Sequence, residues 1–100
     1  MSQGNAAVTA DDDRVRVTTW TFAAAGDATG WHRHQFDYVV VPVTGGTFTV
    51  IGADGAEREM EQRAGEAYLG AEGTEHDVVS QSDGAVFVEI ELKRSADRPG

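Results

Sequence analysis

The sequence predicts an all-β protein whose antiparallel strands form a sandwich or a barrel. Runs of valine, threonine and aromatic residues recur through the middle of the chain, and these residue types favour strands. Glycine-containing turns separate the runs at roughly 8–12-residue intervals, a spacing typical of all-β domains. Residues 86–92 read Val-Phe-Val-Glu-Ile-Glu-Leu, so that aliphatic residues at every second position alternate with Phe, Glu and Glu. This period of two indicates a strand with two different faces.

The other clear strand signals lie between residues 14 and 51. Residues 14–22 are rich in Val, Thr and aromatic side chains, and residues 35–43 contain Tyr38 followed by three valines. Residues 47–51 follow a Gly-Gly turn. Each of these segments therefore predicts one strand.

Residues 56–64 present a conflict between local propensity and context. They are made of good helix formers, so a short helix is one alternative. However, a helix of about nine residues is marginal in water, and Met60 is the only large apolar residue available to anchor it. We instead expect residues 57–62 to form a charged edge strand, hairpinned to residues 47–51 through the turn at Asp54-Gly55.

The two ends of the chain look different from its middle. Residues 1–13 read as a loose arm that ends in three consecutive aspartates, and residues 94–100 read as a polar tail. Chain termini of this kind are often mobile. We therefore expect a flexible N-terminal arm, a single barrel domain over residues 14–93 and a flexible tail.

Composition restricts the possible functions. Seventeen acidic residues oppose eight basic ones, for a formal charge of −9, which argues against nucleic acid and anionic membranes as partners. The absence of cysteine excludes thiolate chemistry, and no segment resembles a signal peptide or a membrane span. We expect a cytoplasmic protein. An anionic substrate would need local positive charge, and Arg33 is one candidate to supply it.

Three histidines are the only ones in the chain, and their placement suits a metal. His32 and His34 form a His-x-His pair, and alternate residues of a strand point to the same face. His76 lies beyond a segment punctuated by glycines. Neutral imidazole is the commonest protein ligand for metals, so the three residues are candidate ligands.

On these residues the sequence resembles the cupin family, which carries two motifs. The first is glycine, five residues, His-x-His, three or four residues, glutamate, six residues and glycine, and its positions here are Gly26, His32, His34, Tyr38 and Gly45. The second is glycine, five residues, Pro-x-Gly, two residues, histidine, three residues and asparagine, and its positions here are Gly65, Ala71, Gly73, His76 and Ser80. The main departure is a tyrosine where the first motif has its glutamate.

The resemblance implies an antiparallel β-barrel of the jelly-roll type. It also implies that His32, His34 and His76 bind one divalent transition metal, which could be Fe, Mn, Ni, Cu or Zn. The fourth ligand stays open between Asp37, Tyr38 and water. The chain looks most like a subgroup of very small cupins, some of which are assigned to β-alanine degradation.

The side chains of Tyr38 and Asp37 should point in opposite directions. Alternation from His34 places Tyr38 on the face of the histidines and Asp37 on the other face, unless a bulge intervenes. Tyr38 is then either a catalytic hydroxyl near the metal or an aromatic filler of the barrel interior.

Together with the three histidines, the resemblance implies a metal-dependent enzyme that acts on a small polar metabolite in catabolism. Dioxygenase, isomerase and lyase chemistries remain open, and the alternative is a non-catalytic module that binds or senses a small ligand. The resemblance also implies a homodimer, because small cupins commonly pair. Trp20 or Phe22, facing outward, would supply the apolar centre of its interface.

Overall fold

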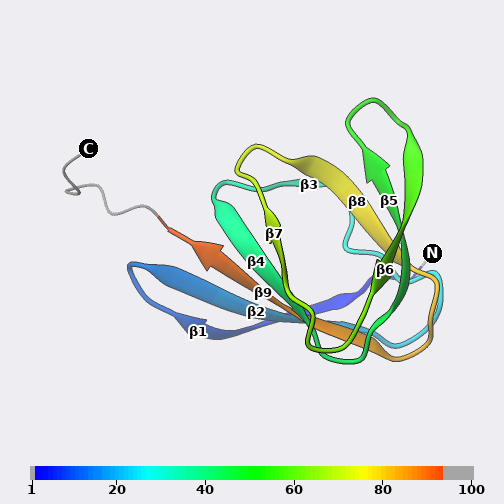
Figure 1. Cartoon of the computed structure of the whole chain (residues 1–100), viewed down its shortest axis with the longest axis horizontal. Coiled ribbons are helices and arrows are strands. Elements are labelled where there is room, and N and C mark those ends of the chain that lie inside the picture. The colour runs from blue at the N-terminus through cyan, green and yellow to red at the C-terminus, as the bar shows by residue number, and fades with distance from the viewer. Residues whose placement is uncertain (1, 94–100) are drawn as a thin grey trace.

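Over residues 2–93, the computed structural model contains nine strands and no helix. They form two antiparallel sheets that face each other and curve into a barrel (Figure 1). The strands are β1 (Asn5–Asp11), β2 (Val15–Phe22), β3 (His32–Arg33), β4 (Asp37–Pro42), β5 (Gly46–Gly52), β6 (Glu57–Gln62), β7 (Tyr68–Gly70), β8 (Glu75–Ser80) and β9 (Ala85–Leu92). One sheet has the order β1-β2-β9-β4-β7, and the other has the order β3-β8-β5-β6. The predicted all-β antiparallel fold is confirmed.

The hydrophobic core lies between the two sheets. Phe22 and Phe87 enter it from the five-stranded sheet and Phe48 enters it from the four-stranded sheet. Their ring centroids are 5.4–5.7 Å apart, and burying each side chain contributes roughly 1.5–3 kcal/mol. These contacts hold the sheets together below the site described in the next section.

The hairpin predicted for residues 47–62 is confirmed. β6 pairs with β5 in the register Thr47↔Glu61 to Ile51↔Glu57. The glutamates of β6 point away from the barrel, whereas Arg58 and Met60 pair with the buried residues Val50 and Phe48 and so share their inward face. Pairing with β5 therefore overrides the helical propensity of this segment.

The expected loose N-terminal arm is corrected by the structure. Asn5–Asp11 forms β1, which pairs with β2 along the edge of the larger sheet. Without β1, the edge of β2 would expose unpaired backbone amides and carbonyls. Every residue of β1 is exposed, so the strand buries no side chain that a hydrophobic pattern could reveal. The tail at residues 94–100 lies outside the described residues.

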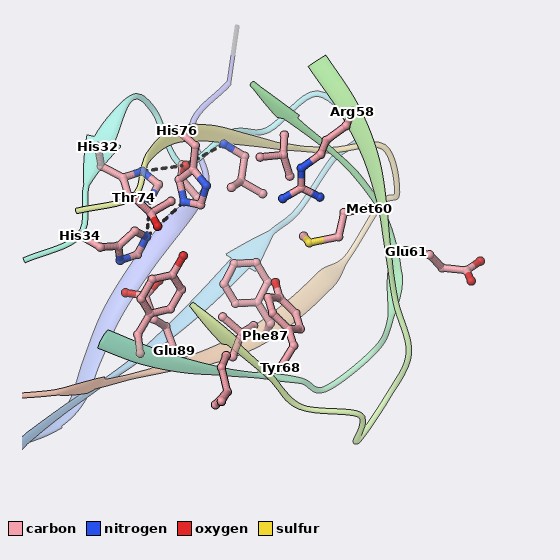
Figure 2. Close-up of a pocket in the computed structure, with 16 residues that line it drawn as sticks. His32, His34, Arg58, Met60, Glu61, Tyr68, Thr74, His76, Phe87 and Glu89 are labelled. Carbon is pink, nitrogen blue, oxygen red and sulfur yellow. Dashed lines mark hydrogen bonds between the residues drawn. The ribbon is translucent and has the colours of Figure 1, made fainter. Parts of the chain in front are cut away.

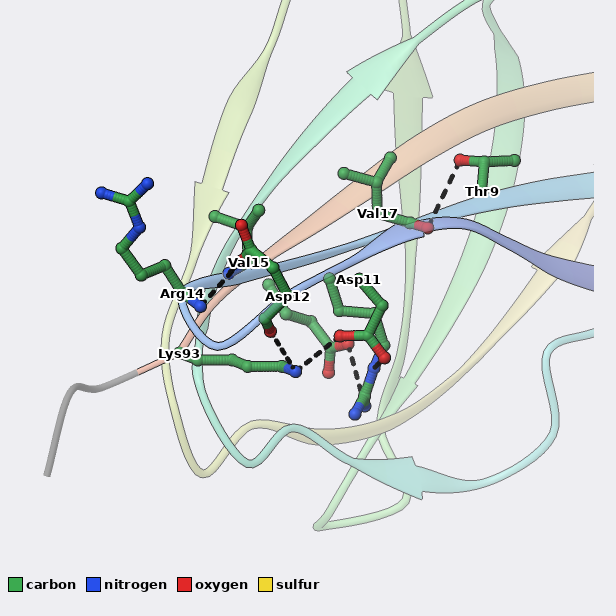
Figure 3. A network of polar contacts seen from close by, with 9 residues as sticks. Thr9, Asp11, Asp12, Arg14, Val15, Val17 and Lys93 are labelled. Carbon is green, nitrogen blue, oxygen red and sulfur yellow. Dashed lines mark hydrogen bonds and ion pairs between the residues drawn. The ribbon is translucent and has the colours of Figure 1, made fainter.

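Polar contacts anchor the hairpin between β1 and β2 (Figure 3). An Asp12 Oδ1 atom accepts hydrogen bonds of 2.8 Å from the backbone amides of Arg14 and Val15. The Lys93 ammonium donates to Asp11 Oδ1 at 2.6 Å and to the carbonyl oxygen of Asp12 at 2.7 Å. The end of β9 is thereby tied to the turn that follows β1.

Neither Trp20 nor Phe22, one of which was expected to face outward, lies on the outer face of the sheet. Phe22 is fully buried in the core, and Trp20 stacks on it with ring centroids 6.0 Å apart. Both therefore lie on the inner face of β2. In residues 2–93, no helix has the length and apolar character needed to cross a membrane.

Candidate metal centre and its pocket

The structure brings the three histidines together at one point of the barrel. His32 of β3 lies directly opposite His76 of β8, and His34 follows immediately after β3. The Nε2 atom of His34 is 3.1 Å from the Nε2 atom of His32 and 3.1 Å from that of His76. One ligand atom from each residue lies within 4.8 Å of the other two.

These distances fit three ligands of a single metal ion. Two nitrogens bound to one first-row metal at about 2.1 Å are separated by about 3.0 Å at a right angle and by about 3.4 Å at a tetrahedral angle. The observed spacing of 3.1 Å falls between these limits. A bound cation would take one nitrogen lone pair from each of the three imidazoles.

Neighbouring groups fix the orientation of two of the imidazoles. The Nδ1 atom of His32 is 2.8 Å from the carbonyl oxygen of Gly30, so an Nδ1–H donor leaves Nε2 free to bind a metal. Such an outer hydrogen bond is the usual way of setting the tautomer of a ligand histidine. The ring of His34 stacks on Tyr38, with centroids 3.7 Å apart and planes at 15°.

The electrostatic environment keeps two of the rings neutral. Burial, followed by the neighbouring His32, lowers the pKa of His34 and of His76 to about 4. Neutral imidazole is the form that binds metals. Protons should therefore compete little for these two ligands near neutral pH.

Tyr38 points into the barrel beside the histidines, and Asp37 points out. Tyr38 is only 5% exposed, and burial raises the pKa of its hydroxyl. The exposed Asp37 carboxylate accepts a 2.8 Å hydrogen bond from the backbone amide of Glu72. The orientations are those expected, but the reason differs. β3 and β4 belong to different sheets, so no single regular strand runs from His34 to Tyr38.

A glycine makes the position of Tyr38 possible. Gly70 of β7 lies opposite Tyr38 in the register. A Cβ atom at Gly70 would lie 2.0 Å from the Cζ atom of the tyrosine ring, far inside van der Waals contact. Only glycine, which has no Cβ atom, therefore leaves room for the ring at this position.

A cavity of about 440 Å³ opens beside the histidines (Figure 2). Figure 2 shows Arg58 directed into it from β6, with Met60 of the same strand just below Arg58 and with Phe87 and Tyr68 lower in the view. Glu89 lies on the side of His34. The volume suits a small metabolite, and the walls combine apolar surface with a few polar groups, as ligand pockets do.

Sequence reasoning missed Arg58 and Glu89 as pocket residues. Glu89 pairs in the sheet with the buried residue Val40, so it faces the interior. Burial, and then the nearby Glu91, raises the pKa of Glu89 to about 7. The alternating patterns of β6 and β9 carried this signal, but only the register shows which face is the inner one. Arg33, the expected source of positive charge, is exposed and does not line the cavity.

A two-sheet antiparallel barrel that gathers a His-x-His pair and a later histidine at one point defines a cupin. No family model matches the chain. It is 46% identical over 87 residues to the Beta-alanine degradation protein BauB of Pseudomonas aeruginosa, and the match covers 86% of this chain and 90% of that protein. The chain therefore belongs to the family of small cupins that includes BauB.

Solved structures agree with this assignment. A cupin domain from Bordetella pertussis Tohama I is 42% identical with a TM-score of 0.87, and the match covers 93% of this chain and 96% of that one. A cupin superfamily protein from Desulfitobacterium hafniense, at 14% identity and a TM-score of 0.72, shares the fold over 92% of this chain and 79% of its own. The predicted jelly-roll cupin fold and the resemblance to cupins of β-alanine degradation are confirmed.

Proposed function

We propose that this cupin binds one divalent transition metal through His32, His34 and His76 and uses it to transform a small polar metabolite. The observation that carries the proposal is the approach of three Nε2 atoms to the spacing of ligands on one ion. Three protein ligands leave coordination positions for water or substrate, as in catalytic metal sites. The ligand set is compatible with Fe, Mn, Ni, Cu or Zn.

A bound metal would supply Lewis acidity or activate a bound water or dioxygen. The protein would supply the pocket that holds the substrate and the side chains that donate or accept protons. Tyr38 stacks against His34 and, with its pKa raised by burial, stays protonated and can donate a hydrogen bond at the edge of the site. Glu89, whose pKa is about 7, suits proton transfer near neutral pH. We therefore assign Tyr38 and Glu89 as the candidate catalytic residues.

The family suggests a metabolic setting. BauB is named for β-alanine degradation, and we propose that this chain acts in the same catabolic process. The substrate would then be a short, polar compound. A cavity of about 440 Å³ accommodates a molecule of that size.

The test is turnover by untagged protein loaded with each candidate metal in turn. β-Alanine and the short oxo and hydroxy acids related to it would be supplied, and their consumption followed by NMR. We expect conversion of at least one compound with one metal, and loss of conversion after chelation or in His34→Gln. Ligand-induced stabilisation without any conversion would instead identify a module that binds or senses the ligand.

We also propose that the protein is a homodimer. On the outer face of the larger sheet, Val17, Ile90, Val39 and Leu69 are neighbours across four adjacent strands. Leu69 is 80% exposed. Two copies could meet over this row without burying a charge, and two-fold pairing is the commonest assembly of soluble proteins. This row takes the place of Trp20 and Phe22 as the apolar centre.

A further inference from the structure

Arg58 starts from the inner face of a barrel strand and lines the cavity, although its side chain remains exposed to solvent. Its backbone pairs with that of Val50, a core residue, so its side chain starts from the inner face of β6. Figure 2 shows the guanidinium directed into the cavity on the side of His76. Its positive charge contributes to the lowered pKa of His76 and opposes the rise in the pKa of Tyr38. Arg58 therefore acts electrostatically on the site itself.

Arg58 has no partner of its own within residues 2–93. The ion pairs of this region join Arg16 to Asp11 and Glu91, Arg63 to Glu61, and Lys93 to Asp11. Arg58 forms neither an ion pair nor a hydrogen bond with any described residue, although the chain has 17 acidic residues. An unpaired guanidinium at a pocket wall offers a fork of donors that matches a carboxylate.

The opposite side of the pocket limits the charge of the ligand. Glu89 also lines the cavity and also has no partner among the described residues, yet it makes no ion pair with Arg58. The two groups are thus held apart with space between them. One guanidinium balances one negative charge, whereas a phosphate group of about −1.5 to −2 would leave excess negative charge close to Glu89.

We propose that Arg58 binds the carboxylate of a small organic acid whose other polar end lies toward the three histidines. Placing that second end at a metal rests on the proposed metal centre, but the carboxylate contact does not. The inward direction of Arg58, its lack of a protein partner and the single positive charge that it brings to the cavity support this assignment. It makes Arg58 a determinant of substrate class.

The experiment compares acids with their neutral amides by isothermal titration calorimetry on zinc-loaded full-length protein. The probes are glycolate, 3-hydroxypropionate and 4-hydroxybutyrate, each beside the corresponding amide. We expect at least one acid to bind about tenfold more tightly than its amide, which corresponds to about 1.4 kcal/mol. Arg58→Gln should remove this preference, and Arg58→Lys should retain part of it. Arg33→Gln, a change of the same kind outside the pocket, should behave as the wild type.

The inference is overturned if no acid binds, if acids and amides bind alike, or if the preference survives Arg58→Gln. Two controls distinguish this inference from the proposed metal centre: the metal content of the protein is measured, and the titrations are repeated on chelated protein. If the chain holds no metal but still prefers acids in a manner that needs Arg58, the metal centre fails and the carboxylate contact stands. If metal is bound and Arg58→Gln does not change the preference for acids, the metal centre stands and the carboxylate contact fails.

Discussion

Single residues set the shape of the site, and Gly70 shows this best. The ring of Tyr38 occupies the space that a side chain at Gly70 would need, and Tyr38 in turn stacks on His34. Gly70, which has no functional side chain, thus helps to position the candidate metal ligand His34 through Tyr38. The phenol is held in place by packing rather than by a charge.

Gly70→Ala should therefore displace Tyr38 and destabilise the protein by about 1–3 kcal/mol, the usual cost of overpacking. Urea denaturation measures this change. Gly52→Ala is a matched control, because Gly52 also ends a strand and its nearest obstacle is the Asp54 carboxylate at 3.3 Å, which can move. Equal losses in the two variants would contradict the role given to Gly70.

Glu89 should make stability depend on pH in a defined window. Its pKa in the folded protein is about 7 against an ordinary 4.5, so between these values the folded state keeps a proton that the unfolded chain has lost. Stability must then fall as pH rises across the window. The carboxyl is partly reached by water, so we expect a loss of about 2 kcal/mol rather than the full value of the shift.

Glu89→Gln tests this in metal-free protein, because glutamine stays neutral throughout. The variant should gain stability relative to the wild type between pH 4.5 and 7 and keep that gain above the window. All other ionisable groups are common to both proteins, so their contributions cancel in the difference. A difference that does not change with pH would show that Glu89 has an ordinary pKa.

At the scale of elements, the β1–β2 hairpin depends on one carboxylate. Hydrogen bonds from the backbone amides of Val15 and Arg14 lower the pKa of Asp12 below its ordinary 3.8. The stabilisation is present above that value and is lost as pH falls through the lower folded value. The neighbouring Asp13 forms no side-chain hydrogen bond with any residue between 2 and 93.

Asp12→Ala should consequently lower the melting temperature at neutral pH, whereas Asp13→Ala should leave it nearly unchanged. Differential scanning calorimetry measures both, and the gap between the variants should close in strong acid. Hydrogen exchange should also be faster in β1 of the Asp12 variant. Identical melting curves for the two variants would contradict the capping role of Asp12.

The strands also differ in how well the sequence predicts them. β6 was predictable because its short length and its turn outweighed its helical propensity, and the histidines were predictable from the spacing of two motifs. β1 was not, because an exposed edge strand leaves no hydrophobic period. Arg58 and Glu89 were not predictable as pocket residues, because only the register with Val50 and Val40 shows that they start from the inner face. Arg58 remains exposed to solvent even there.

At the scale of the whole molecule, we expect two copies of the protein to form a dimer through the outer face of the larger sheet. Light scattering in about 0.15 M salt, where charge repulsion is screened beyond about 8 Å, should give about twice the chain mass of 10.7 kDa. Ile90→Glu places a charge in the middle of the apolar row and should yield monomers. Val8→Glu, at an exposed site outside the row, should remain dimeric. A wild-type monomer would refute the pairing.

The metal content of untagged protein tests the central claim most directly. After equilibration with each candidate divalent metal and removal of the excess, mass spectrometry of the elements should find one tightly held ion per wild-type chain. His34→Gln should lose it, because His34 contacts both other ligands, and chelation should lower the melting temperature of the wild type but not of the variant. A wild-type chain that retains none of these metals, or a His34 variant that retains as much as the wild type, would contradict the account.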